Sequence, residues 1–189
     1  MSVHLYAVTT LDGKIALDEY DDIKWSSAED KAFLTQEMKG FQLAFVGRAT
    51  YDVSSAFFHD KTCVVFSRSV TELTQRGDRL FYAPLEGFHP SEFCHLVGIE
   101  RAAVLGGSQI YSYFLKMGWV DHIHLTLEPL LFGHGVSWLS TREVHQSYQL
   151  TSMTQLNTRG TLLLEYKRLG DLTLETPAPV VDLAGKSEA

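Results

Sequence analysis

Short apolar segments alternate with segments of helical character through the first 118 residues, and this alternation limits the fold more than any other feature. We expect strands in residues 3–9, 41–47, 62–69, 81–84 and 101–107. Helices are expected in residues 25–40, 48–57, 89–98 and 108–118. Strands that alternate with helices form mostly parallel sheets, because each helix carries the chain back to the edge where the previous strand began.

The pattern changes after residue 120. Residues 121–128 alternate strictly, with Ile123, Leu125 and Leu127 on one face and polar side chains on the other. Residues 147–156 and 161–169 flank "NTRG" and predict an antiparallel hairpin. We therefore expect an α/β fold with a mostly parallel central sheet and an antiparallel C-terminal hairpin. Residues 1–169 form one domain in this interpretation, and residues 170–189 form a tail.

Composition excludes some classes of function. The 189 residues carry a net charge of −7 without a cluster of Lys and Arg, so we expect no nucleic-acid partner. No apolar run approaches the length of a membrane span and the N-terminus lacks the features of a signal peptide, so we expect a cytoplasmic protein without a membrane partner. Cys63 and Cys94 have no metal or redox spacing and are expected to be reduced thiols.

Three of the expected strands end in segments that suit a phosphate-bearing ligand. These segments are residues 47–50, 67–69 and 106–108, which read "GRAT", "SRS" and "GGS". Ligands of open α/β sheets bind outside the carboxyl ends of the strands, where helix N-termini attract anions and glycine allows close approach. The alternative is that Arg48 and Arg68 are surface arginines that bind backbone carbonyl groups.

The order of several motifs resembles the dihydrofolate reductase superfamily. These motifs are "AVTTLDGKIA", Trp25, "VGRATY", "VVFSRS" and "VLGGSQIYSYFL". The later segment "GWVDHIHLTLEPLLFGHG" is closer to the reductase domain of the bifunctional deaminase/reductase of riboflavin biosynthesis, the RibD C-terminal type. The resemblance covers residues 3–167. It implies a dihydrofolate-reductase-like three-layer fold with NADPH bound across the strand ends.

The resemblance also implies roles for the residues at these strand ends. Arg48 and Thr50 would contact the phosphates of NADPH, and Ser67 and Arg68 would lie near its 2′-phosphate. Guanidinium groups suit phosphate oxygens, which agrees with these roles. The full expected set is Gly47, Arg48, Thr50, Ser67, Arg68, Gly106, Gly107, Ser108, Gln109 and Ile110.

On the substrate side, Asp30 is the candidate acid. By resemblance it lies where dihydrofolate reductases keep their single pocket carboxylate, and Thr126 lies where they keep a threonine linked to it. The alternative is that Asp30 completes a capping box with Ser27, because the two residues have the S-x-x-D spacing. Lys14 either meets a substrate phosphate or is an exposed turn lysine, and Trp25 is expected beside the substrate.

We expect hydride transfer from NADPH to a pyrimidine- or pteridine-like heterocycle, of the 5-amino-6-(5-phosphoribosylamino)uracil reductase type. The alternatives are a dihydrofolate reductase and a non-catalytic nucleotide-binding protein with the same fold. Two departures from the riboflavin type keep the alternatives open: Leu105 replaces a glutamate, and only Asp52 stands in the segment that usually contains Asp-Asp-Pro. No metal site is expected, because His122 and His124 form only a pair. The oligomeric state is open, with a homodimer as one option.

Overall fold

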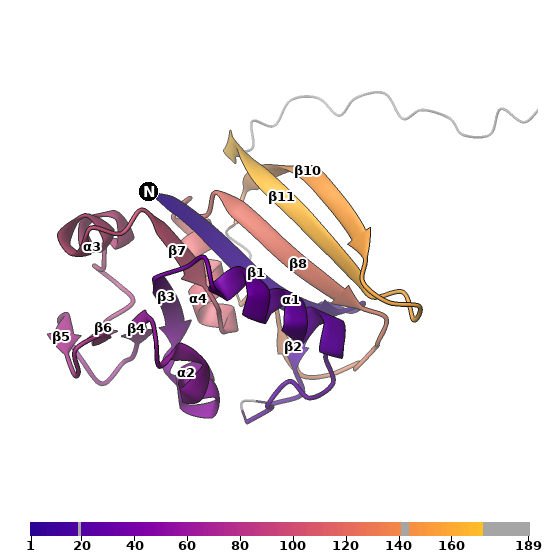
Figure 1. Cartoon of the computed structure of the whole chain (residues 1–189), viewed down its shortest axis with the longest axis horizontal. Helices are drawn as coiled ribbons and strands as arrows, with labels where there is room; N and C mark the ends of the chain where they lie inside the picture. The colour runs from indigo at the N-terminus through magenta and orange to yellow at the C-terminus, as the bar shows by residue number, and fades with distance from the viewer. Residues whose placement is uncertain (19, 141–143, 172–189) are drawn as a thin grey trace, which may run out of the picture.

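A nine-stranded sheet forms the centre of the protein (Figure 1). The computed structural model describes residues 1–18, 20–140 and 144–171. The strands lie in the order β10-β11-β8-β1-β7-β3-β4-β6-β5. Six of them run parallel: β1 (Ser2–Thr10), β3 (Leu43–Gly47), β4 (Thr62–Phe66), β6 (Leu80–Ala83), β7 (Arg101–Val104) and β8 (His122–Glu128).

The strands at the two edges of the sheet run antiparallel to their neighbours. They are β5 (Thr74–Gln75), β10 (Gln146–Gln155) and β11 (Leu162–Asp171). The mostly parallel sheet and the C-terminal hairpin predicted from the sequence are therefore confirmed. Strand β11 includes Gly170 and Asp171, and the rest of the predicted tail lies outside the described residues. The domain boundary stays a prediction.

Helices lie where the sequence predicts them. They are α1 (Ala28–Met38), α2 (Arg48–Ser54), α3 (Pro90–Val97) and α4 (Ser108–Lys116), and the 3-10 helix η1 (Ser55–Phe58) follows α2. A second, small sheet pairs β2 (Lys14–Ala16) with β9 (Val136–Ser137). The sequence pattern did not predict this pair, because strands of two or three residues are too short to show a period of two.

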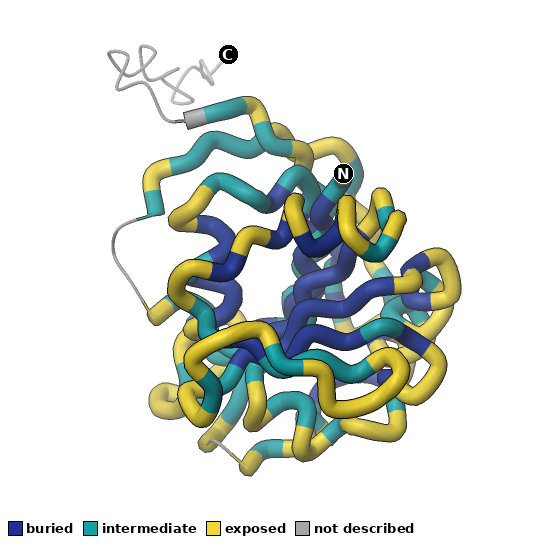
Figure 2. Tube along the Cα trace, turned by 90° about the vertical axis from the view of Figure 1, so that its left-hand side faces the viewer, coloured by how far each residue is buried: buried dark blue, intermediate teal, exposed yellow. Residues whose placement is uncertain are grey.

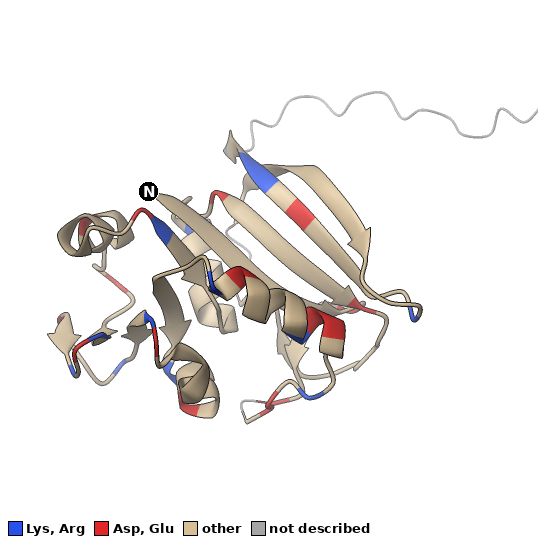
Figure 3. Cartoon of the chain, in the orientation of Figure 1, with Lys and Arg blue, Asp and Glu red and all other residues tan. Residues whose placement is uncertain are grey.

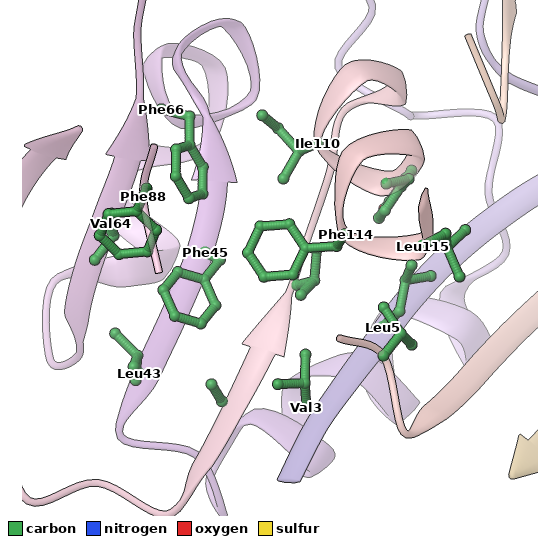
Figure 4. Packing of buried hydrophobic residues seen from close by; sticks show 14 of the residues in the cluster. Val3, Leu5, Leu43, Phe45, Val64, Phe66, Phe88, Ile110, Phe114 and Leu115 are labelled. Carbon is green, nitrogen blue, oxygen red and sulfur yellow. The ribbon is translucent and has the colours of Figure 1, made fainter. Parts of the chain in front are cut away.

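The core lies on both faces of the central sheet, because successive residues of its strands point to opposite sides. Leu43 and Phe45 of β3 pack on the face that α3 and α4 cover, where the rings of Phe45 and Phe114 lie 5.2 Å apart (Figure 4). Ala44 and Val46 pack on the other face, beneath α2 and η1. The central strands are buried along most of their length (Figure 2). This arrangement is the expected three-layer fold.

Helix α1 covers one face of β1 and the face of β8 that the sequence predicts to be polar. Phe33 of α1 packs against Tyr6 of β1 and His124 of β8. The alternation predicted for β8 is confirmed, yet Thr126 and Glu128 on its polar side are buried rather than exposed to water. Buried polar side chains need partners, so Thr126 and Glu128 make this side of β8 a candidate functional surface. In the described ranges no helix is long and apolar enough to cross a membrane.

Candidate active site

The carboxyl ends of β3 and β7 are in direct backbone contact. The two strands are parallel neighbours, and the N–H of Gly47 donates a hydrogen bond to the carbonyl of Gly106 at 2.6 Å. A Cβ on Gly47 would lie 3.4 Å from the backbone nitrogen of Gly107 and 3.2 Å from Cγ1 of Ile110. The structure therefore brings together two of the three segments that the sequence singles out, with backbone against backbone.

The adjacent glycines at the end of β7 differ in what surrounds them. Gly106 has φ +96°, and a Cβ there would lie 2.9 Å from the ring of Tyr111. Gly107 has φ −81°, and a Cβ would meet only Oγ1 of Thr50, at the ordinary distance of 3.5 Å. The peptide bond between the two glycines is cis. The fold itself requires a glycine at 106, whereas a Cβ at 107 would make only an ordinary contact with Thr50.

Helix α4 begins immediately after this glycine pair. Gly107 is its N-cap residue and supplies no side-chain acceptor to the first turn, which contains Ser108, Gln109 and Ile110. Backbone N–H groups at such a helix start suit an anion. Farther along α4, Tyr111 and Phe114 are buried in the core.

The two candidate phosphate-binding arginines, Arg48 and Arg68, differ in their partners and exposure. Arg48 is half exposed, and its Nε donates to both carboxylate oxygens of Asp52, at 2.7 and 3.0 Å. Its guanidinium also lies 5.6 Å from the centre of the Tyr82 ring. Arg68 is exposed in the loop after β4, beside Ser67. A phosphate at Arg48 would therefore compete with Asp52, whereas Arg68 is exposed.

Ser67 and Ser69 form a small turn around Arg68. The hydroxyl oxygens of the two serines lie 2.8 Å apart, and the N–H of Ser69 donates to the hydroxyl of Ser67 at 3.2 Å. The neighbouring strands β4 and β3 are parallel, so this turn follows the same edge of the sheet as Gly47. The three segments share one edge, as the sequence predicts.

Asp30 lies in the first turn of α1 and is 8% exposed. Its backbone N–H donates to the hydroxyl of Ser27 at 3.2 Å, which makes Ser27 the N-cap. The N–H of Ser27, however, donates to the carboxylate of Glu128 at 2.6 Å. Only half of the expected capping box is therefore present, and the Asp30 carboxyl does not complete it. Figure 3 shows acidic residues at both ends of α1.

Burial raises the pKa of Asp30 above its usual range. Hydrogen bonding from the Thr126 hydroxyl opposes this shift, and the charge of Glu128 adds to it. Thr126 is itself buried on β8, so the pairing of Asp30 with Thr126 that the resemblance implies is consistent with their positions. A carboxyl with a raised pKa holds its proton at higher pH and can act as an acid.

Tyr111 of α4 contacts both β1 and the glycine pair that follows β7. Its hydroxyl donates to the carbonyl of Tyr6 at 2.6 Å, and its ring lies against Gly106. Burial, together with the charge of Asp30, raises the pKa of Tyr111. The charge of Asp30 thus acts on the same phenol that packs against Gly106.

The remaining expected substrate residues lie near the small sheet. The ammonium of Lys14 donates to the hydroxyl of Ser137 at 3.0 Å, between β2 and β9. The indole N–H of Trp25 donates to Asp21 at 3.2 Å, and its ring packs edge-on against Phe132. Both side chains thus have partners within the protein.

Two carboxylates of this region were missed by the sequence interpretation. Asp12 accepts hydrogen bonds from the hydroxyl of Thr10 and the N–H groups of Phe132 and Gly133, and the Thr10 bond is the main reason that its pKa falls to about 2. Glu128 is completely buried beside α1. The signal for Glu128 was present in the sequence, since it follows Thr126 by two residues on the polar side of one strand.

The histidines of β8 belong to a row that includes His4 of β1. Nδ1 of His4 lies 3.2 Å from Nε2 of His124, and the rings of His4 and His122 stack at 4.5 Å. Nδ1 of His124 lies 3.1 Å from the carboxylate of Glu165. Within the described ranges, no group of three or more His, Cys, Asp or Glu residues has the arrangement of a metal site.

Comparison with known proteins identifies the fold. No protein-family model and no curated protein matches this chain. Solved structures do resemble it. The first, a protein from Shewanella sp. PV-4 named for riboflavin biosynthesis, has a TM-score of 0.70 and 23% identity over 89% of this chain and 99% of its own.

The second is a pyrimidine reductase-like protein from Corynebacterium diphtheriae, with a TM-score of 0.70 and 14% identity over 90% of this chain and 92% of its own. The third is a diaminohydroxyphosphoribosylaminopyrimidine deaminase/5-amino-6-(5-phosphoribosylamino)uracil reductase from Thermotoga maritima, with a TM-score of 0.67 and 19% identity over 88% of this chain. This chain spans 56% of that protein. The similarity confirms the fold that the resemblance implied.

Proposed function

We propose that this protein is an NADPH-dependent reductase that transfers hydride to a pyrimidine- or pteridine-like heterocycle. The observation that carries the proposal is the contact between Gly47 and Gly106 at the ends of β3 and β7, with the buried acid Asp30 close to the same tyrosine that packs on Gly106. A ligand site at the carboxyl edge of a parallel sheet and an acid beside it are the two parts that such a reduction needs.

The residues at the sheet edge suit a dinucleotide. A side chain at Gly107 would occupy the space between Thr50 and the start of α4, although the fold has no need for a glycine there. The N–H groups at a helix N-terminus suit a pyrophosphate. Gly47, Thr50, Gly107 and Ser108 would hold the pyrophosphate and nicotinamide side, and Arg68 with Ser67 would hold the adenosine 2′-phosphate.

The chemistry divides between cofactor and protein. NADPH supplies the hydride. Asp30 holds a proton above the usual pH range of an aspartate and donates it to the acceptor, so that the C=N or C=O bond gains one hydride and one proton. The buried positions of Asp30 and Thr126 keep water away from this acid.

Among heterocycles, the 5-amino-6-(5-phosphoribosylamino)uracil type is preferred over dihydrofolate. The named activities of two proteins with the same fold, a pyrimidine reductase-like protein and a deaminase/reductase, support this preference. Lys14 and Trp25 would lie on the substrate side, next to the β2–β9 sheet.

Steady-state NADPH oxidation with a panel of heterocycles tests the proposal. The panel contains 5-amino-6-(5-phosphoribosylamino)uracil, its dephosphorylated form and dihydrofolate, and each product is identified by mass spectrometry. Turnover of the first compound is expected to exceed that of dihydrofolate. Faster turnover of dihydrofolate would favour the dihydrofolate reductase alternative. Tight NADPH binding without turnover of any compound would favour a non-catalytic nucleotide-binding protein.

A further inference from the structure

Glu128 is the last residue of β8, and its side chain is completely buried. Its carboxylate accepts hydrogen bonds from the N–H of Ser27 at 2.6 Å and from the hydroxyl of Thr161 at 2.7 Å. A guanidinium nitrogen of Arg159 lies 3.9 Å away, on a side chain that is 62% exposed. Burying a carboxylate is costly, and two neutral donors with one distant, solvated cation offset only part of that cost. The stability of the fold therefore does not explain why a glutamate is buried at position 128.

Glu128 occupies a position that local sequence assigns to Asp30. In a capping box, the side chain three residues after the N-cap accepts the N–H of the N-cap residue. Ser27 is the N-cap of α1 and Asp30 is three residues later, but Glu128 of β8 accepts this N–H instead. The Asp30 carboxyl is thereby free from the role that its spacing predicts.

The groups around Asp30 come from each element packed against it. Burial and the charge of Glu128 favour its protonated form, whereas hydrogen bonding from Thr126 of β8 and from Ser26, with the charge of Lys31 of α1, favours its ionised form. Tyr111 of α4 uses its only hydroxyl hydrogen for the carbonyl of Tyr6, so it cannot donate to Asp30. The charge of Glu128 therefore adds to burial in opposing the ionisation of Asp30.

We propose that Glu128 is a positioning residue for Asp30, an inference that rests on the proposed function: Glu128 replaces the Asp30 carboxyl in the cap of α1 and leaves that carboxyl as the proton donor to the heterocycle. The proton leaves Asp30 as hydride is added to the neighbouring atom of the substrate, and Asp30 is reprotonated from solvent when the product departs. Glu128 contacts neither the substrate nor the cofactor in this scheme.

The test is the titration of Asp30 itself, followed by NMR with 13C at the aspartate carboxyls. Asp30→Asn identifies its signal. Glu128→Gln keeps the size of the side chain and an oxygen for the N–H of Ser27 but removes the charge, so Asp30 is expected to titrate at lower pH than in the wild type. Glu29→Gln is the matched control, because it removes an equal charge from the exposed side of the same helical turn. It is expected to leave the titration unchanged.

A second variant covers the case in which Glu128→Gln does not fold. Glu128→Asp keeps the charge but shortens the side chain, which opens the N–H of Ser27 to Asp30. A new hydrogen bond to the ionised carboxylate also moves the Asp30 titration to lower pH. An unchanged Asp30 titration in the folded variants overturns the inference.

The experiment distinguishes failure of this inference from failure of the proposed function. The titration uses no substrate, so a shifted Asp30 signal together with no turnover of any heterocycle by the wild type would support the coupling of the two carboxyls and contradict the reductase. When both proposals hold, activity falls as pH rises through the Asp30 titration, and this limb of the pH profile moves to lower pH in Glu128→Gln.

Discussion

The ring of Tyr111 lies so close to Gly106 that a methyl group on this glycine would come within 2.9 Å of it. The ring cannot easily move, because its hydroxyl is fixed to the carbonyl of Tyr6 and the side chain is buried. Gly107, one residue later, has ordinary space around it. The fold therefore requires a glycine at position 106, whereas at position 107 the requirement would come from a ligand.

Alanine at the two glycines is expected to affect different properties: stability at position 106 and NADPH binding at position 107. Gly106→Ala forces a side chain into both a positive φ and the ring of Tyr111, and we expect a loss of about 2 kcal/mol or more in the free energy of unfolding. Gly107→Ala is expected to change this free energy by less than about 0.5 kcal/mol and to weaken NADPH binding. Urea unfolding and cofactor titration measure the two effects. Unchanged NADPH affinity in a stable Gly107→Ala variant would place the cofactor elsewhere.

The preference for NADPH over NADH is expected to depend on Arg68. The 2′-phosphate is the only difference between the two cofactors, and a protein of net charge −7 repels it without local compensation. A hydrogen bond to a charged group contributes about 1.5–3 kcal/mol, so Arg68→Ala should weaken NADPH binding about tenfold or more. NADH binding should change little.

Fluorescence titrations of both cofactors test this expectation. Arg48→Ala is the informative comparison, because Arg48 is already bonded to Asp52 and its loss also releases that carboxylate. Equal weakening of NADPH and NADH in Arg68→Ala would show that this arginine does not recognise the 2′-phosphate.

Asp30→Asn is expected to reduce turnover strongly and to stabilise the protein near neutral pH. The pKa of Asp30 is raised in the folded protein, so the folded state binds this proton more tightly than the unfolded state does. Its contribution to stability is therefore largest below the unfolded pKa and declines as pH rises through the folded pKa. Asparagine removes the charge and keeps the size. Thermal unfolding at pH 7, with Glu29→Gln as the control, measures the gain, and a lower melting temperature would contradict this account.

Sequence patterns predicted the layers of the fold because hydrophobic period and helix caps act over a few neighbouring residues. They also brought Gly47, Ser67 and Gly106 to one edge, since parallel strands share their carboxyl ends. The partner of Ser27 could not be predicted in this way. A local rule pairs it with Asp30, but β8 brings Glu128 to the same N–H from 101 residues away. The pairing of β2 with β9 also depends on distant segments, and no periodicity indicates it.

The row formed by His4, His122 and His124 is expected to make the stability of the fold depend on pH. Burial, together with the charges of His122 and His124, lowers the pKa of His4 from 6.5 to about 3. Burial also lowers the pKa of His124, against the opposing charges of Glu165 and Glu37. Both rings are therefore neutral in the folded protein at pH values where an unfolded chain binds protons to them.

Stability is accordingly expected to fall as pH decreases below about 6.5, the unfolded pKa of histidine. Between this pH and the folded pKa of His4, about 3, the unfolded state binds the additional proton, so stability declines with each pH unit. His4→Phe keeps a ring against Phe41 and removes the titrating group, so the slope between pH 6 and 4 should flatten. His95→Gln, at an exposed position on α3, is the control. Urea unfolding at several pH values measures the slopes, and equal slopes for His4→Phe and the wild type would contradict the prediction.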